Sequence, residues 1–222
     1  MIDFNKMIDN HLAKDKRPKQ AGRYYPSEIG TCMRKTWYSY KFPLDITPAL
    51  MKIFELGNIL HDFVVEVLKS DKNPNIELLR AEMPLKMEFD EFIVSGRIDD
   101  LLLIKDRGQQ ILVEVKSCKN IKFVNGPQKH HAMQLQFYMH ASGVHNGVLL
   151  YIDKTTLQSK VFPVAYEDLN AKMIEKRFTI LHEHVRDNIL PLPEAKMNTI
   201  DGWLCNFCEY KNKCDQNKGI DN

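Results

Sequence analysis

The chain has 222 residues, enough for one large domain or for one domain with a small appendage. Its formal charge of +2 is too small to indicate a nucleic-acid partner by itself, although a local basic groove would not show in the total. No apolar run approaches the ~20 residues that span a bilayer. The charged start of the chain lacks the apolar stretch of a signal peptide, so we expect a cytoplasmic protein with no membrane partner.

Apolar spacing and turn residues predict a succession of helices and strands. A short helix is expected over 3–14, and a second over 27–40 with Ser27 as its N-cap. A long amphipathic helix should follow over 48–69. Residues 76–117 are typical of a strand meander, with a strand at 92–104. The remaining expected elements are a helix at 128–142, strands at 147–153 and 157–164, and a helix at 166–188.

The strands of the meander carry charged residues where a buried strand would be apolar. Alternation places Asp99 on one face of its strand and Asp100 on the other. In the next strand Glu114 and Lys116 share a face, and the opposite face is wholly apolar. If the strands are adjacent, Asp99, Glu114 and Lys116 converge, and two carboxylates suit Mg²⁺ or Mn²⁺. The alternative is an ordinary ion pair at a strand end, which contributes little.

Two more motifs lie on predicted helices. Gly57 and His61 stand four residues apart in the long helix. Gln134 and Tyr138 are also four residues apart, which places them on one face of their helix. Taken singly, each pair has an ordinary explanation, because a histidine beside an apolar stripe is more often a core residue than a ligand.

The order of these motifs carries more information than any one of them. GxxxH, GxxD, ExK and QxxxY follow one another at Gly57–His61, Gly96–Asp99, Glu114–Lys116 and Gln134–Tyr138. This order resembles the RecB-like branch of the PD-(D/E)XK nucleases. The resemblance implies an α/β fold with a restriction-endonuclease-like core, in which helices flank a mixed central β-sheet. It implies catalytic roles for Asp99, Glu114, Lys116, Gln134 and Tyr138, and a Mg²⁺ or Mn²⁺ ion held by His61, Asp99, Glu114 and the carbonyl of Val115.

Four of the five cysteines form a second pattern. Cys205 and Cys208 make a CxxC motif, Cys214 follows after five residues, and Cys32 lies far upstream. Spacing alone fits a zinc site as well as an iron–sulfur site. The arrangement resembles Cas4 and AddB-type nucleases, which implies a [4Fe–4S] cluster that joins the N- and C-terminal segments. The fifth, Cys118, is interpreted as a buried free thiol.

The resemblance covers nearly the whole chain and implies one nuclease domain over 1–222. Its parts are an N-terminal helical segment at 1–47, the PD-(D/E)XK core at 48–190 and a cluster-binding segment at 191–222. The implied activity is a metal-dependent, Cas4-like exonuclease on single-stranded DNA ends, with CRISPR adaptation or recombination proteins as partners, or a role in viral DNA processing. The alternative is a catalytically silent DNA-binding subunit of a larger complex, stabilised by an iron–sulfur cluster or by zinc.

Basic residues near the motifs indicate where DNA would lie. The predicted contacts are Arg97, Lys119, Lys122 and Lys129, with His130 and His131 beside them, and the loop at 119–131 is the favoured part. A second basic set at 14–23 is better explained as a solvated face. Aromatic residues that could stack on unpaired bases are Tyr24, Tyr25, Trp37 and Phe123.

Overall fold

The computed structural model describes residues 1–13, 18–198 and 201–217. In this part of the chain a six-stranded sheet has the order β1–β3–β4–β5–β6, and β2 pairs with β3. Two strand pairs, β1 with β3 and β4 with β5, are parallel and the others are antiparallel, so the sheet is mixed as predicted. The strands are β1 (Arg23–Tyr24), β2 (Ile76–Glu88), β3 (Ile93–Ile104), β4 (Gln109–Cys118), β5 (Asn146–Asp153) and β6 (Ser159–Ala165).

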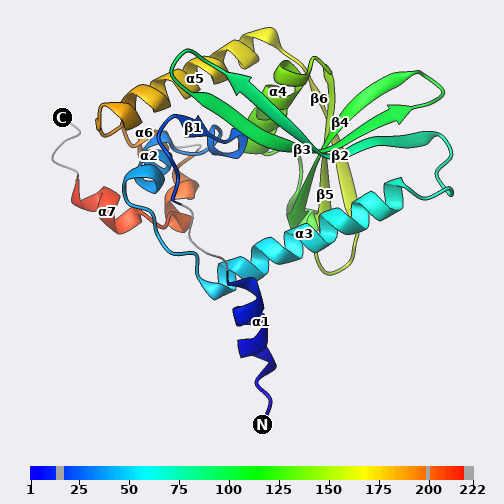
Figure 1. Cartoon of the computed structure of the whole chain (residues 1–222), viewed down its shortest axis with the longest axis horizontal. Helices are drawn as coiled ribbons and strands as arrows, with labels where there is room; N and C mark the ends of the chain where they lie inside the picture. Colours follow the sequence, from blue (N-terminus) through cyan, green and yellow to red (C-terminus); the bar gives the residue numbers. More distant parts are fainter. Residues whose placement is uncertain (14–17, 199–200, 218–222) are drawn as a thin grey trace.

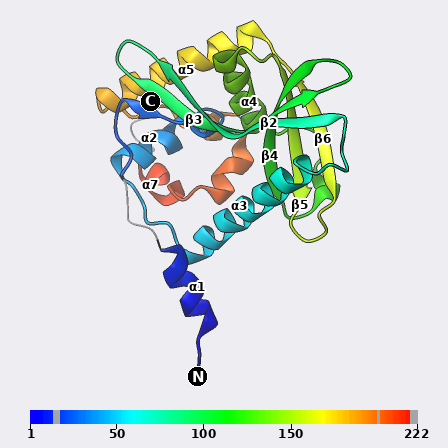
Figure 2. The same ribbon diagram turned by 45° about the vertical axis from the view of Figure 1, so that its right-hand side comes forward.

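Helices cover both faces of the sheet (Figure 1). Helix α3 runs across one face, α4 and α5 lie on the other, and α2, α6 and α7 gather beside the sheet, as a turned view also shows (Figure 2). None of the described helices is long and apolar enough to cross a membrane. The helices are α1 (Phe4–Leu12), α2 (Met33–Lys41), α3 (Pro48–Leu68), α4 (Lys129–Ser142), α5 (Asp168–Arg186), α6 (Glu194–Met197) and α7 (Lys211–Gln216), with 3-10 turns η1 (Pro26–Glu28), η2 (Ile121–Phe123) and η3 (Gly202–Phe207).

The helix expected over 27–40 is wrong in its first part. The chain instead makes the 3-10 turn η1, and α2 begins only at Met33 with Cys32 as its N-cap. The short strand β1 was not predicted, because two residues are too few to show a period. Both differences matter for function, since they place Cys32 at a helix start and β1 at the edge of the site described below.

Helix α3 buries only part of its apolar surface. Leu60 and Val64 pack against Val115, Leu150 and Ile152 on one face of the sheet. The N-terminal half of the helix extends past the sheet (Figure 1). Its apolar side chains there, such as Ile53 and Phe54, are therefore exposed, although their spacing resembles that of a core-facing stripe.

A partly exposed ion pair joins the N-terminal and C-terminal parts of the chain. Arg177 of α5 makes a two-pronged contact with Glu194 at 2.6 Å and also donates to the carbonyls of Ile29 and Thr31 at 2.9 Å. Glu194 in turn accepts a hydrogen bond from the backbone N–H of Met33 at 2.8 Å. Bidentate arginine–carboxylate contacts are strong and geometrically specific, so these bonds fix the segment before α2 against the C-terminal segment without any metal.

Gly30 is required where this segment approaches α4, and we expect Gly30→Ala to destabilise the protein strongly. A Cβ at this position would lie 2.3 Å from the Cα of His130, a backbone atom that cannot move aside cheaply. Overpacking of this kind costs about 3 kcal/mol in the free energy of unfolding, measurable by urea denaturation. Gly126→Ala is the matched control, because nothing lies within 4 Å of its added Cβ. Equal stability of the two variants would contradict the close approach.

Candidate active site

The site lies where one edge of β3 is shared by two strands. β1 pairs with Ile93 and Val94, while β4 pairs with the stretch from Asp100 to Ile104. The edge of β3 between these two ladders is open. A cleft of about 960 Å³ occupies the opening. All the residues predicted to be catalytic or to bind the divalent ion line this cleft, namely His61, Asp99, Glu114, Val115, Lys116, Gln134 and Tyr138.

Asp99 and Glu114 enter the cleft from the two diverging strands. The Oδ2 atom of Asp99 accepts a hydrogen bond from the backbone N–H of Val115 at 2.8 Å. The pairing of β4 with β3 ends at Val113, so the N–H of Val115 has no backbone acceptor on β3. The Asp99 carboxylate accepts its hydrogen bond instead. The Nζ atom of Lys116 lies 2.5 Å from Oε1 of Glu114, whose side chain is only 1% exposed.

Gln134 on α4 connects these groups to the helix. Its Nε2 donates to Oε1 of Glu114 at 2.7 Å and to the hydroxyl of Tyr138 at 3.3 Å, while its Oε1 accepts from Nζ of Lys116 at 3.3 Å. Gln134 and Tyr138 can share this task because residues four apart lie on one helix face. The QxxxY motif therefore holds the lysine and the glutamate in place.

The carboxyl groups of Asp99 and Glu114 are buried close together, and both have raised pKa values. Burial raises the pKa of Asp99 above its usual value. Burial, and then the charge of Asp99, raises the pKa of Glu114 to about 8. Burial lowers the pKa of Lys116, but Glu114 and Asp99 outweigh it, and the pKa of the lysine is raised. A cation beside the two carboxylates would relieve their repulsion.

His61, which the sequence predicted as a ligand of the divalent ion, also contacts a buried carboxylate. Asp100 points away from Asp99, as alternation requires, but α3 covers that face, and Nε2 of His61 lies 3.4 Å from Oδ2 of Asp100. Hydrogen bonding to Asp100, which is fully buried, raises the pKa of His61 to about 9. The sequence showed which face Asp100 occupies but not that α3 brings a histidine to it, so Asp100 is a buried partner of His61 rather than a bystander.

The residues present fit a divalent ion in their chemistry. In the described part of the chain, Oε2 of Glu114 is buried without a hydrogen-bond partner, and such atoms are uncommon in the absence of a ligand. Nε2 of His61 and Oδ2 of Asp100 face each other instead. Among the described residues no three His, Cys, Asp or Glu side chains are gathered closely enough to hold a metal ion. Mg²⁺ nevertheless needs only one or two carboxylates, since water and substrate phosphate complete its shell.

The carbonyl of Val115 is suitably directed for the role predicted for it. The N–H and C=O groups of one residue in an extended strand point to the same side. Because the N–H of Val115 meets Asp99, its carbonyl also faces the opening between β4 and β3.

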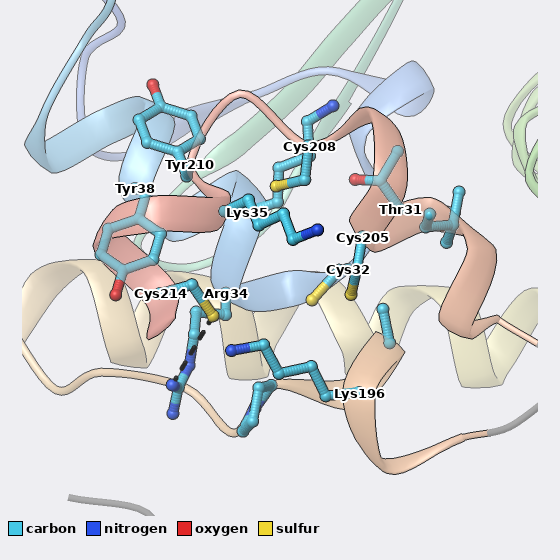
Figure 3. A pocket seen from close by; sticks show the side chains of 14 residues that line it. Thr31, Cys32, Arg34, Lys35, Tyr38, Lys196, Cys205, Cys208, Tyr210 and Cys214 are labelled. Carbon is cyan, nitrogen blue, oxygen red and sulfur yellow. Dashed lines mark hydrogen bonds between the residues drawn. The ribbon is translucent and has the colours of Figure 1, made fainter. Parts of the chain in front are cut away.

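The four cysteines of the second motif line one small pocket of about 60 Å³ between α2, η3 and α7. Figure 3 shows the sulfur atoms of Cys32 and Cys205 turned toward each other. Cys214 lies on the other side of the pocket, with its Sγ 4.0 Å from Nη1 of Arg34, and Cys208 is set apart. In the described structure these thiols share a pocket but are not drawn together around one centre.

The surroundings of these thiols suit an anionic metal centre. Lys35, Lys196 and Arg34 line the same pocket. Burial raises the pKa of both Cys205 and Cys208, so metal binding would release protons. Cys118 is half-buried and packs against the main core, away from this pocket.

The residues predicted to contact DNA differ in whether they form ion pairs within the protein and in whether they line the cleft. Arg97 lines the cleft but pairs with Glu82 at 2.9 Å. Lys129 pairs with Asp201 at 3.2 Å, whereas Lys119 and Lys122 lie exposed on the loop after β4. Of the second basic set, Lys14, Lys16 and Arg17 lie outside the described residues, Lys19 pairs with Glu28, and Arg23 lines the cleft.

Two of the four aromatic residues cannot stack on a base. Tyr24 and Trp37 are core residues, because β1 and α2 turn them inward. Tyr25 lines the cleft, and Phe123 is 81% exposed. The structure also gives specific contacts to Asp100, His131 and Tyr151, which sequence reasoning had not assigned. His131 stands three positions before Gln134, on the same helix face, and that spacing was the signal available in the sequence.

Comparison with solved structures finds similar folds. The protein described as SSO0001 superposes with a TM-score of 0.58 at 21% identity, over 92% of this chain and 90% of that one. An exonuclease from Laribacter hongkongensis, solved in complex with dAMP, gives 0.57 at 14% identity, over 76% of this chain and 90% of that one. A phage-related exonuclease from Haemophilus somnus gives 0.55 at 10% identity, over 84% and 98%. These identities show a shared fold alone.

No curated protein matches the chain in sequence. A family model described as the PD-(D/E)XK nuclease superfamily matches residues 26–215, which include every motif discussed above. Proteins of this superfamily use divalent ions such as Mg²⁺ or Mn²⁺. The match spans most of the chain and coincides with the cleft geometry, and the chain belongs to the PD-(D/E)XK nuclease superfamily.

Proposed function

We propose that the protein is a Mg²⁺- or Mn²⁺-dependent exonuclease that hydrolyses phosphodiester bonds at single-stranded DNA ends. The observation that carries this proposal is the bonded set of Asp99, Glu114, Lys116 and Gln134 in one cleft. An inactive relative would need only to lose one of these groups, and the chain has kept all four.

The reaction is a displacement by water at a backbone phosphate. Asp99 and Glu114, with the carbonyl of Val115 and His61, would hold the divalent ion, which supplies Lewis acidity and lowers the pKa of a bound water. Lys116, held by Glu114 and Gln134, positions the water and donates to a phosphate oxygen as negative charge develops. Its raised pKa keeps it protonated for this role. Tyr138 acts through Gln134, which it contacts at 3.3 Å.

Exonuclease activity and a preference for single-stranded ends each have one supporting observation. Some of the solved structures with a similar fold are described as exonucleases, one of them with dAMP bound. Phe123 is exposed on the loop after β4, next to Lys122, and offers a stacking surface for an unpaired base.

The test is incubation of the purified protein with end-labelled single- and double-stranded DNA, with and without Mn²⁺. We expect metal-dependent release of short products from linear single strands and little cleavage of a circular single strand. Binding of DNA without cleavage under every metal condition would instead indicate the silent DNA-binding subunit.

The four cysteines of the pocket are proposed to bind a [4Fe–4S] cluster, which would make the protein a Cas4-like nuclease. Their support is the shared pocket of Cys32, Cys205, Cys208 and Cys214 and its basic lining. A role in CRISPR adaptation, recombination or viral DNA processing, beside the corresponding partner proteins, belongs to the same proposal.

Anaerobically purified protein is expected to be brown, with a broad absorption band that fades on oxidation. Zinc has a filled d shell and gives no colour, so colourless protein with stoichiometric zinc and no iron would contradict the cluster. Cys205→Ser should lose the colour, and Cys118→Ser should keep it, because only Cys205 lies in the pocket. Both variants should stay folded, since Arg177 and Glu194 join the chain ends independently.

A further inference from the structure

One histidine in the cleft has no role in the reaction as described so far. His131 belongs to α4 and lines the cleft together with Lys116 and Gln134. It stands three residues before Gln134 and seven before Tyr138, so the three side chains follow one face of the helix. The face that holds the catalytic lysine therefore extends by one residue toward the N-terminus of α4.

The hydroxyl of Tyr151, on β5, contacts the ring of His131. Tyr151 is the register partner of Lys116 in the parallel pair of β4 and β5, so both side chains lie on the same side of the sheet. Its hydroxyl lies 2.8 Å from Nδ1 of His131 and accepts a hydrogen bond from the backbone N–H of Gln128 at 3.0 Å. The tyrosine is almost fully buried, and the two bonds fix its position.

We assign the hydrogen of His131 to one ring nitrogen from these bonds. The hydroxyl of Tyr151 already accepts from Gln128, and its own hydrogen is directed to the nearest acceptor, Nδ1 of His131. A neutral imidazole has one N–H, which then resides on Nε2. The ring consequently presents a fixed donor on the side turned away from Tyr151.

His131 also remains uncharged. Burial, followed by His130 and Lys116, lowers the pKa of His131 to about 2. Burial also raises the pKa of Tyr151, so its hydroxyl keeps its hydrogen. Neither group titrates near neutral pH.

We infer that His131 is a substrate-binding residue whose Nε2–H donates a hydrogen bond to a non-bridging oxygen of a DNA backbone phosphate in the cleft. The inference rests on the proposed nuclease function and names a further contact with its substrate. A phosphate is the acceptor that fits, because the basic residues that line the cleft outnumber its acidic residues and favour an anionic backbone. The basic residues are Arg23, Lys86, Arg97 and Lys116, and the acidic ones are Glu82, Asp99 and Glu114. A neutral donor adds a phosphate contact without placing another cation next to Lys116.

The chain contains a matched control for this arrangement. His140, also on α4, has its Nδ1 2.8 Å from the hydroxyl of Tyr166, the same kind of contact at the same distance, but neither residue lines the cleft. Replacing the histidine by phenylalanine keeps an aromatic ring and removes both nitrogens. Both variants lose the contact with a tyrosine hydroxyl, His140→Phe also loses the contact with Glu175 at 3.0 Å, and only His131→Phe removes a donor from the cleft.

The first measurement is the affinity of the metal-free protein for a short single-stranded oligonucleotide. We expect His131→Phe to weaken binding about tenfold or more, because a hydrogen bond to a charged group is lost. His131→Gln should recover part of the affinity through its side-chain N–H, and His140→Phe should stay within about twofold of the parent. Equal binding by His131→Phe and His140→Phe, or failure of the parent to bind the oligonucleotide, would overturn the inference.

A second measurement separates a neutral donor from a proton donor. The ratio of cleavage rates between the parent and His131→Phe should be constant between about pH 6 and about pH 9, because His131 does not titrate there. A ratio that grows as the pH falls would show a protonated imidazole instead and would overturn the inference. Nitrogen NMR shifts of isotope-labelled histidine should show Nε2 of His131 protonated and Nδ1 bare, and a Nδ1–H tautomer would equally overturn it.

Failure of the inference and failure of the proposed function give different results. A parent that binds the oligonucleotide through His131 but cleaves nothing with Mg²⁺ or Mn²⁺ would refute the nuclease activity and leave the phosphate contact standing. A parent that cleaves, with His131→Phe unchanged in both affinity and rate, would refute only the contact.

Discussion

Replacing Lys116 by alanine is expected to lower the rate of DNA cleavage at least ~100-fold while leaving the fold intact. Among the described residues the Lys116 side chain bonds to Glu114 and Gln134, and these two can still bond to each other through Nε2 of Gln134. The loss should fall on turnover, because the lysine acts on charge that develops in the transition state. Single-turnover cleavage of an end-labelled strand measures it directly.

Lys86→Ala is the control for this prediction. Lys86 lines the same cleft and carries the same charge, but it lies on β2 and pairs with the exposed Glu88. Its removal should change cleavage by no more than a few-fold, since exposed ion pairs contribute little. If Lys116→Ala cleaves DNA about as fast as Lys86→Ala does, Glu114 and Lys116 form only a structural ion pair and the nuclease proposal fails. Asp100→Ala is unsuitable as a control, because it removes the buried partner of His61.

Glu114→Gln is expected to abolish cleavage and yet to stabilise the metal-free protein at alkaline pH. The folded protein holds the pKa of Glu114 at about 8, far above its usual value, because of burial and then Asp99. Between the unfolded and folded pKa values only the folded state keeps the proton, so the free energy of unfolding decreases as the pH rises toward about 8. Glutamine carries no charge and escapes this loss.

The gain is on the order of 2 kcal/mol, because Lys116 loses its partner in the same change and offsets part of it. In thermal unfolding with a chelator, the variant should melt about 5 °C above the parent near pH 8.5, with a smaller difference near pH 5. Mn²⁺ should raise the melting temperature of the parent more than that of the variant. A variant that melts below the parent at alkaline pH would contradict the buried, strained state of Glu114.

Much of the site could be predicted because its residues sit in regular elements. The period of a strand places Glu114 and Lys116 on one face, and the period of a helix does the same for Gln134 and Tyr138. Periodicity does not predict which side chain of another element contacts a given residue. Asp100 was expected on the far face and lies there, but the approach of His61 depends on how α3 crosses the sheet.

Other features escaped prediction because they depend on contacts between distant segments. The open edge of β3 exists because a two-residue strand, β1, occupies one end of it and β4 the other. Ile53 and Phe54 are exposed because the N-terminal half of α3 extends beyond the sheet. The spacing of apolar residues along the helix does not predict where the sheet ends. The Tyr151 contact with His131 joins residues 20 positions apart through a parallel strand pair, and parallel register has no local signature.

The ion pair of Arg177 and Glu194 also sets the order in which the molecule can be completed during synthesis. Its bonds to the early segment join residues 146 positions apart at Thr31 and 161 apart at Met33. Domains fold as their parts leave the ribosome, so the turn that carries Cys32 lacks these bonds until the chain has been made as far as Glu194. Cys205, Cys208 and Cys214 come later still. The proposed metal centre on these thiols would therefore form only after Cys214 has been made, in a pocket that Arg177 and Glu194 already hold in place.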